Sequence, residues 1–261
     1  MTQIGRDNPA ERIPLPKGGS VTLGWAASTD VGNRRQVNED SFVAAPPVFA
    51  VADGMGGHSA GDLASEAVVN RLAGTFPEGF ATPAAIGLAL AQAAQDITHL
   101  EGTSVLGAGT TVTGVALTLS EDDPYFAVFN VGDSRVYHYS ESGLEQVTVD
   151  HSVVQELVDA GAITRAQADH HPDSNVITRA IGFNETPMPD YWLLPVEVGT
   201  RLVVCSDGLT KEIDDARLAE ILREGAPARQ TAVSLVEAAL ESGGRDNVTV
   251  IVVDVLAVEA P

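Results

Sequence analysis

The sequence predicts a single α+β domain in which helices pack in layers against mainly antiparallel sheet. The chain has 261 residues, of which 44% are hydrophobic, and this is enough to bury one large core. Apolar, β-branched runs follow one another through the middle of the chain, whereas helix-like stretches come in pairs. Because strand and helix do not alternate strictly, antiparallel sheet is favoured over a parallel one. The sequence contains no internal repeat.

Short runs rich in Val, Ile, Thr and aromatic residues predict the strands. From the N-terminus they cover 21–29, 41–45, 48–52, 110–119, 125–131, 135–140, 144–149, 191–198, 201–206 and 248–256. The second and third runs are separated only by Pro46 and Pro47, so we expect them to pair with each other.

Apolar residues spaced three to four positions apart predict the helices. These stretches cover 62–76, 83–100, 152–161, 215–225 and 228–242. The first 19 residues carry charges and three prolines and lack either pattern. We therefore predict a flexible N-terminal tail over 1–19 and one domain over 20–258.

The net charge narrows the choice of partners. Fifteen Lys and Arg against 36 Asp and Glu give a formal charge of -21, which repels phosphate backbones and anionic lipid headgroups. We therefore expect neither a nucleic acid nor a membrane as partner. The single Cys205 cannot form an internal disulfide, the N-terminus lacks the apolar region of a signal peptide, and no run is long enough to cross a bilayer. The sequence predicts a cytoplasmic protein.

Aspartates recur where apolar runs end. VFAVADG ends at Asp53, FAVFNVGDS at Asp133 and LVVCSDG at Asp207, while Asp246 precedes the run VTVIVV. Asp-Gly is common in turns, and a turn explains any one of these aspartates. Four of them at strand edges are more simply explained as carboxylates gathered at one rim of a sheet. Such a cluster needs compensation, and oxygen ligands without His or Cys favour Mg²⁺ or Mn²⁺ over zinc.

A charged loop precedes these runs. The segment TDVGNRRQVNEDS, residues 29–41, places Glu39 and Asp40 close to Arg34 and Arg35. Taken alone, this segment is equally well explained as a solvated loop. Beside a carboxylate-rich metal site, an arginine fork would suit the oxygens of a phosphoryl group.

Seven motifs resemble, in the same order, those of the metal-dependent protein phosphatases, the type 2C or PPM family. The motifs are DVGNRRQVNED, VADGMGGH, GAGTTV, NVGDSRVY, VTVDHS, CSDGL and GRDNVTVIVV, and the similarity to compact bacterial members runs from about Val21 to Leu256. The resemblance implies a central antiparallel β-sandwich flanked by helix pairs, in four αββα layers, with a small helical flap over 151–180. It also implies hydrolysis of phosphoserine and phosphothreonine by a metal-activated water.

The resemblance further implies which residues bind two Mn²⁺ or Mg²⁺ ions. Asp53 would bridge both ions, the carbonyl of Gly54 would join the second, and Asp207 and Asp246 would bind the first. Asp133 together with Asp207 resembles the site of a third ion in bacterial members.

The same resemblance assigns the remaining roles. Glu39 and Asp40 would act through metal-bound waters, with Asp40 orienting the nucleophile, and Arg35 would hold the substrate phosphate in preference to Arg34. The partners implied are phosphorylated Ser/Thr proteins, including a bacterial Ser/Thr kinase or its substrates, and the chain is expected to be a monomer.

One departure from the family pattern concerns the general acid. Many eukaryotic members have His directly after the Asp-Gly pair, where this chain has Met55, and a thioether cannot donate a proton. His58 is more simply structural, and the leaving-group acid therefore stays unassigned. His170 and His171 could form a metal pair but are typical of an exposed segment, and the Asp150-His151 pair indicates a loop with Ser152 as a helix cap.

The sequence disfavours three alternative interpretations. GHSAG, residues 57–61, matches the nucleophile elbow of serine hydrolases, but it lies five residues beyond its strand, and no His follows His171. Cys205 as a phosphatase nucleophile would need Arg where Lys211 stands. A non-catalytic relative would tend to lack one of the metal-binding carboxylates, and all four aspartates are present.

Overall fold

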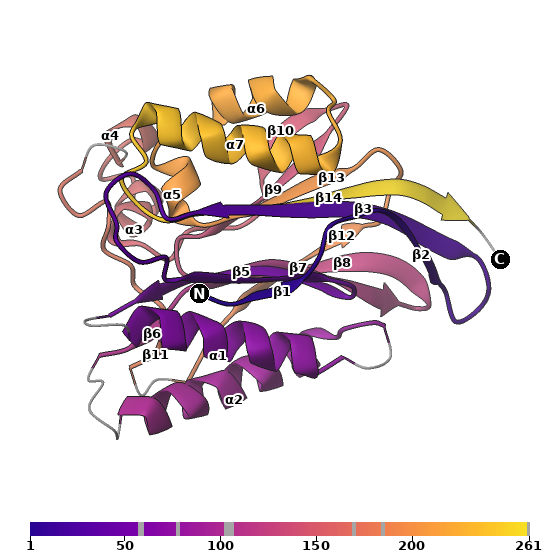
Figure 1. Ribbon diagram of the computed structural model, residues 1–261, viewed down its shortest axis with the longest axis horizontal. Helices are drawn as coiled ribbons and strands as arrows, with labels where there is room; N and C mark the ends of the chain where they lie inside the picture. The colour runs from indigo at the N-terminus through magenta and orange to yellow at the C-terminus, as the bar shows by residue number, and fades with distance from the viewer. Residues whose placement is uncertain (57–59, 77–78, 102–106, 169–170, 184–185, 260–261) are drawn as a thin grey trace.

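Two β-sheets stack face to face at the centre of the molecule, and a pair of helices covers the outer face of each (Figure 1). This computed structural model describes residues 1–56, 60–76, 79–101, 107–168, 171–183 and 186–259. Helices α1 (Ala60–Gly74) and α2 (Pro83–Glu101) cover one sheet, and α6 (Asp215–Arg223) and α7 (Ala228–Ser242) cover the other. The predicted four-layer αββα arrangement is confirmed.

The first sheet has the strand order β1-β4-β5-β7-β8-β12, and the short strands β6 and β11 extend it beside β5. Its strands are β1 (Gln3–Gly5), β4 (Asp40–Ala45), β5 (Val48–Met55), β6 (Gly109–Thr110), β7 (Val112–Ser120), β8 (Asp123–Val131), β11 (Ile181–Gly182) and β12 (Asp190–Pro195). Neighbouring strands are antiparallel except for β1 and β4, which are parallel.

The second sheet has the order β10-β9-β13-β14-β3-β2 and is antiparallel throughout. Its strands are β2 (Asn8–Pro14), β3 (Ser20–Asp30), β9 (Arg135–Ser140), β10 (Gly143–Gln146), β13 (Arg201–Cys205) and β14 (Val248–Glu259). The hairpin expected on either side of Pro46 and Pro47 is present as β4 and β5.

The apolar run of β5 is continuous because both of its faces are buried. Phe49 and Val51 point into the core between the two sheets, where Phe49 meets Trp25 edge to face with ring centroids 5.4 Å apart. Val48, Ala50 and Ala52 point the other way, into the core beneath α1 and α2. The alternation follows from the two-residue period of a strand, and it leaves the next residue, Asp53, at the end of the sandwich.

The expected flexible tail over 1–19 is wrong, because two strands form within it. β1 pairs with β4, and β2 pairs with β3 in a register that sets Ile13 opposite Val21. The indole nitrogen of Trp25 donates to the carbonyls of Arg6 and Ala44, at 3.0 Å in each case. The tail residues therefore cover the edge strands of both sheets, whose backbone groups would otherwise lack partners.

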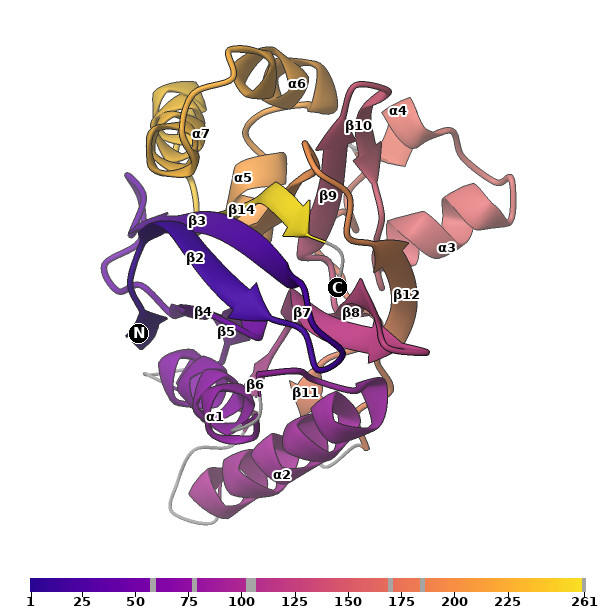
Figure 2. The same cartoon turned by 90° about the vertical axis from the view of Figure 1, so that its right-hand side faces the viewer.

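Within the described ranges, three shorter helices lie outside the two pairs. Helices α3 (Val153–Asp159) and α4 (Arg165–Ala168) fall in the predicted flap segment, residues 151–180, beside the edge strands β10 and β12 (Figure 2). Ser152 caps α3 as predicted, since its hydroxyl accepts from the Gln155 N–H at 3.2 Å. α5 (Asp207–Thr210) begins at one of the candidate aspartates. Among the helices of the described ranges, none is both long and apolar enough to span a bilayer.

Candidate functional site

Five aspartates from both sheets meet at one end of the sandwich. Asp40 opens β4 directly opposite Asp53 on β5, which places both side chains on the same face of the first sheet. Asp133 follows β8, Asp207 opens α5, and Asp246 precedes β14. Burial raises the pKa of the Asp53 carboxyl well above its ordinary value, and the charges of the other four aspartates raise it further. The structure thus brings together the carboxylates that the sequence singled out.

The glycines of the two Asp-Gly pairs allow close backbone contacts and do not form turns. Gly54 lies inside β5, where a Cβ atom would lie 2.1 Å from the carbonyl oxygen of Gly61 at the start of α1. Gly208 lies in α5, where a Cβ atom would lie 1.9 Å from the carbonyl oxygen of Asn247. Any side chain would push β5 away from α1, or α5 away from the start of β14. The two glycines therefore allow the neighbouring Asp53 and Asp207 to lie close to these segments.

Asp40 is fully buried, and the second sheet holds its carboxylate. Its Oδ2 accepts hydrogen bonds from Ser206 Oγ at 2.9 Å and from Thr249 Oγ1 at 2.6 Å. Its Oδ1 is buried and has no hydrogen-bond partner in the described part of the chain. Burial raises the pKa of Asp40 to about 7, and the charges of Asp207 and Asp246 act in the same direction. One carboxylate oxygen is therefore fixed while the other is free to accept a proton or a ligand.

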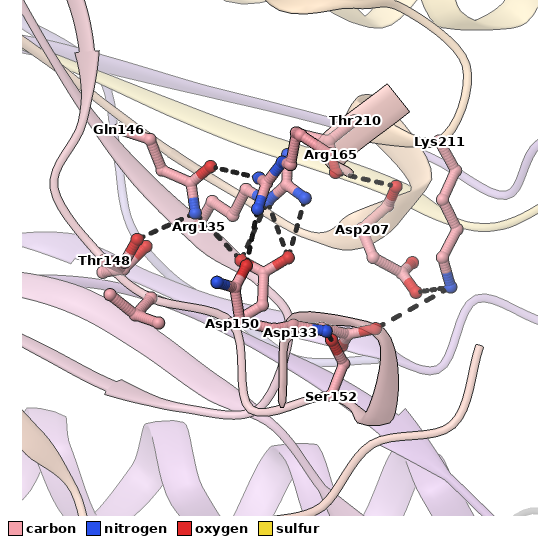
Figure 3. A network of polar contacts seen from close by, with 12 residues as sticks. Asp133, Arg135, Gln146, Thr148, Asp150, Ser152, Arg165, Asp207, Thr210 and Lys211 are labelled. Carbon is pink, nitrogen blue, oxygen red and sulfur yellow. Dashed lines mark hydrogen bonds and ion pairs between the residues drawn. The ribbon is translucent and has the colours of Figure 1, made fainter. Parts of the chain in front are cut away.

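Lys211 contacts both Asp133 and Asp207 (Figure 3). Its ammonium group is paired with Asp207 Oδ2 and lies 3.8 Å from Asp133 Oδ2. Burial, together with the charge of Asp207, raises the pKa of Asp133 to about 7, whereas Lys211 lowers it. Burial lowers the pKa of Lys211, but the two aspartates raise it by more. Lys211 is thus a cation within the carboxylate cluster.

The charged loop before β4 brings Arg35 to the cluster. Arg35 Nη2 donates to Asp246 Oδ2 at 2.8 Å, with its side chain half exposed. Arg34 is also exposed. Glu39 is partly buried beside α1, where burial and the charge of Asp62 raise its pKa. Asn247 fixes this loop, because its Oδ1 accepts from the Glu39 N–H at 2.9 Å. Arg35 therefore faces the same space as the aspartates.

The donor set suits a hard divalent cation. Asp40 Oδ1 and Asp207 Oδ1 are buried carboxylate oxygens without a hydrogen-bond partner among the described residues. No three His, Cys, Asp or Glu side chains of these residues are arranged to bind one ion directly. Arg35 and Lys211 pair with two of the aspartates. Mg²⁺ commonly keeps several waters and takes only one or two carboxylates. The buried, oxygen-only cluster fits such ions, with water completing their coordination.

The base of the flap segment is tied to the strand end that presents Asp133. The Gly132 N–H donates to His151 Nδ1 at 3.1 Å, and the His151 N–H donates to the Gly132 carbonyl at 2.9 Å. His151 Nε2 lies 3.1 Å from Asp190 Oδ2, so the ring is held on both sides. Burial lowers the pKa of His151, which favours the neutral ring in this structural position.

A buried ion pair lies next to this histidine (Figure 3). Arg135 on β9 donates through Nε and Nη2 to Asp150, with the shortest contact at 2.7 Å. Gln146 donates to Asp150 Oδ1 at 2.9 Å and accepts from Arg165 of α4 at 2.9 Å. A continuous set of hydrogen bonds therefore joins α4 of the flap segment to β9 and β10.

Residues 33–241 match the family model described as Protein phosphatase 2C. The chain belongs to this family. It is 35% identical over 239 residues to the serine/threonine phosphatase stp of Listeria innocua. This match covers 87% of this chain and 93% of the Listeria protein. It is 37% identical over 246 residues to the serine/threonine protein phosphatase PstP of Mycobacterium tuberculosis, covering 91% of this chain and 46% of PstP. The chain is a protein serine/threonine phosphatase.

Solved structures agree with the phosphatase fold. The crystal structure of Mycobacterium tuberculosis PstP superposes with a TM-score of 0.84 at 35% identity, over 91% of this chain and all of that one. The catalytic domain of PstP in complex with two manganese ions superposes with a TM-score of 0.77 at 34% identity, over 91% of this chain and 99% of that one.

The structure describes some, but not all, of the other residues that the sequence analysis singled out. Met55 ends β5 and is partly exposed. His58 and Ser59 of the GHSAG motif, and His170, lie outside the described residues. The ring of His171 accepts from the Asp173 N–H at 3.2 Å, a local turn contact. Cys205 is buried, and burial raises its pKa to about 12, so it is a thiol in the core and no nucleophile.

Four residues of the site were missed by the sequence interpretation. Ser206 and Thr249 hold Asp40, Asn247 holds the Glu39 loop, and Lys211 neutralises part of the charge. Ser206 and Asn247 are adjacent in sequence to the predicted aspartates Asp207 and Asp246. This adjacency could have indicated that they belong to the site. Lys211 stands four positions after Asp207, the spacing at which two residues share one face of a helical turn.

Proposed function

We propose that the end of the sandwich described above is the catalytic site and that it holds two Mn²⁺ or Mg²⁺ ions. Asp53, Asp207 and Asp246, with the carbonyl of Gly54, are the proposed protein ligands. The observation that carries this assignment is the presence of buried carboxylate oxygens without partners, Asp207 Oδ1 and Asp40 Oδ1. Bound divalent ions would act as Lewis acids and would lower the pKa of a water bound to them to about 7.

Asp40 is the proposed orienting group for the attacking water. Its Oδ2 is fixed by Ser206 and Thr249, so the direction of the free Oδ1 is fixed as well. A carboxylate with a pKa of about 7 in the metal-free protein is suited to accept a hydrogen bond or a proton near neutral pH. Glu39 borders the same space and is proposed to act through water, since burial raises its pKa without removing it from solvent.

Arg35 is the proposed phosphate-binding residue. Among the described residues, its guanidinium has one hydrogen-bond partner, Asp246, and the half-exposed side chain leaves further donors for a phosphoryl group. The planar fork can bind two phosphate oxygens at once, and its charge stabilises the negative charge of the transition state. Arg34 is exposed and is not assigned a role.

The proposed substrates are phosphoserine and phosphothreonine in proteins, among them a bacterial Ser/Thr kinase or its targets, and the chain is proposed to act as a monomer. The flap segment supports selection of protein substrates at this site, because His151 anchors it next to Asp133. The general acid for the leaving group stays unassigned.

The decisive experiment measures hydrolysis of a phosphothreonine peptide by the purified chain. We expect activity with Mn²⁺ or Mg²⁺ and none in excess EDTA, with recovery when the metal is restored. Full activity in EDTA would refute the metal site. Inactivity with every metal, in a protein that melts cooperatively, would refute the catalytic assignment.

A further inference from the structure

Lys211 contacts the two carboxylates at which the family resemblance places a third divalent cation. The family resemblance associates Asp133 and Asp207 with such an ion, yet in this chain the Lys211 ammonium group is paired with Asp207 Oδ2 and lies 3.8 Å from Asp133 Oδ2 (Figure 3). The side chain is about one-third exposed, at 34%, and its ammonium group is turned towards the two carboxylates. The chain has only two lysines, and the other, Lys17, is on the surface.

The position of Lys211 is fixed by local backbone geometry. Asp207 opens α5 and Lys211 is the C-cap residue of the same turn, with its N–H donating to the Asp207 carbonyl at 2.8 Å. Residues four apart on a helical turn lie on one face, so the pairing of Lys211 with Asp207 follows from the fold of this segment. The backbone carbonyl of Lys211 also accepts from Arg245 Nη2 at 3.2 Å, which holds the end of the turn.

The two oxygens of Asp207 face different partners. Oδ2 is paired with Lys211, whereas Oδ1 is buried and has no partner in the described part of the chain. Oδ1 is therefore the oxygen available to one of the two proposed metal ions. The oxygen that a third ion between Asp207 and Asp133 would need is already engaged by a cation.

We propose that Lys211 takes the charge-balancing place of a third divalent cation between Asp133 and Asp207, so that this chain operates with two ions. The inference rests on the proposed metal site and concerns its stoichiometry. A third divalent ion would have to displace the ammonium group or bind within a few ångströms of it. Like charges at that distance repel strongly in a partly buried site.

Mn²⁺ titration calorimetry on the metal-free protein tests the proposal. We compare the wild type with Lys211→Met, which removes the charge and keeps most of the stem, and with Lys211→Arg, which keeps the charge. Lys17→Met is the matched control, because it breaks a Lys–Asp pair on the surface. We expect two bound ions in the wild type, Lys211→Arg and Lys17→Met. In Lys211→Met we expect a third binding event, with an affinity at least about tenfold above any third event in the wild type.

Three ions in the wild type, or unchanged stoichiometry and affinity in a folded Lys211→Met, would overturn the inference and leave the proposed catalytic site intact. A wild type that binds no Mn²⁺ would overturn the proposed metal site and the inference with it. The two failures are therefore distinguishable.

Amine footprinting of the wild-type protein gives a second test that needs no variant. An acylating reagent modifies Lys211 and Lys17, and mass spectrometry reports both rates, with Lys17 as the internal standard. We expect the ratio of the two rates to change by less than about twofold between EDTA and saturating Mn²⁺, because Lys211 stays on its carboxylates. A rise of tenfold or more in the relative rate of Lys211 with Mn²⁺ would show that metal displaces the lysine and would overturn the inference.

Discussion

Asp40 and Asp53 lie directly opposite each other on the antiparallel strands β4 and β5, with both side chains on one face of the sheet. Like charges in this arrangement destabilise a sheet. Burial raises the pKa of both carboxyls, and each is raised further by neighbouring aspartates. The folded protein therefore retains a repulsive pair at the end of its sandwich, and bound cations or protons relieve the repulsion.

The metal-free protein should lose stability as the pH rises. The pKa values of Asp40 and Asp133 are about 7 in the folded state against an ordinary value of 3.8. Between those values the folded state binds more protons than the unfolded state, so the free energy of unfolding decreases from about pH 4 to about pH 7. Melting temperatures in EDTA from pH 5 to 8 should show this decrease. The double variant Asp40→Asn/Asp133→Asn should lose part of this decrease, since Asp53 keeps a raised pKa through its burial, and an unchanged slope in that variant would contradict the assignment.

Bound metal should reverse this trend. Cations compete with protons for the carboxylates, and ligands that bind only the folded form stabilise it according to their free concentration. We expect the increase in melting temperature caused by Mn²⁺ to be larger at pH 8 than at pH 6. A melting temperature indifferent to Mn²⁺ at pH 8 would be incompatible with a metal site.

Asp53→Asn should lower the activity and raise the stability of the metal-free protein. The substitution removes charge but little volume at the centre of the cluster, so we expect kcat/KM to fall by about a hundredfold or more. The melting temperature in EDTA should rise, because a repelling charge is lost. Asp122→Asn is the control, since Asp122 pairs with Lys17 at the surface and the substitution should leave the activity unchanged. Wild-type activity in Asp53→Asn would exclude the residue as a metal ligand.

Arg35→Ala should weaken phosphate binding and leave metal binding nearly intact. Loss of a charge-assisted contact costs about 1.5 to 3 kcal/mol, and kcat/KM should fall by roughly ten- to a hundredfold. Lys at this position should restore only part of the activity, because a point charge does not reproduce the arginine fork. Steady-state kinetics on a phosphothreonine peptide and Mn²⁺ calorimetry measure the two effects.

Arg34→Ala is the matched control for this assignment. Arg34 is the exposed neighbour of Arg35, so the variant should retain wild-type kinetics. The phosphate site is wrongly assigned if Arg34 proves the sensitive residue or if Arg35→Ala abolishes metal binding.

The buried pair of Arg135 and Asp150 should be important for stability. Their side chains are only 17% and 9% exposed, and Asp150→Ala would leave the guanidinium buried without its partner. We expect the free energy of unfolding to fall by about 3 to 5 kcal/mol. Asp96→Ala, which breaks the exposed pair with Arg71, should change the denaturation midpoint very little. Equal effects of the two substitutions in urea denaturation would contradict the structural role of Asp150.

The sequence by itself determined most of the secondary structure and the residue types of the site. Periodicity located the paired helices and the long strands, because burial on one or both faces leaves a local pattern. The aspartates at the ends of VFAVA, FAVFNV and LVVCS marked one end of a sandwich before its topology was known. The ordered motifs then identified the phosphatase family, since their sequence and spacing are far more specific than any single Asp-Gly pair.

Only the tertiary structure decided how these groups are held and balanced. Residues 3–5 and 8–14 form strands because β4 and β3 would otherwise be edge strands with unpaired backbone groups. The composition of the N-terminal segment does not reveal these partners. Ser206 and Thr249 hold Asp40 from 166 and 209 positions away, and Asp133 approaches Lys211 from the connection between β8 and β9. Local sequence patterns record which face of an element is buried. The partner that reaches a given carboxylate is set by the packing of distant segments, and therefore the charge balance of this site emerges only in the folded chain.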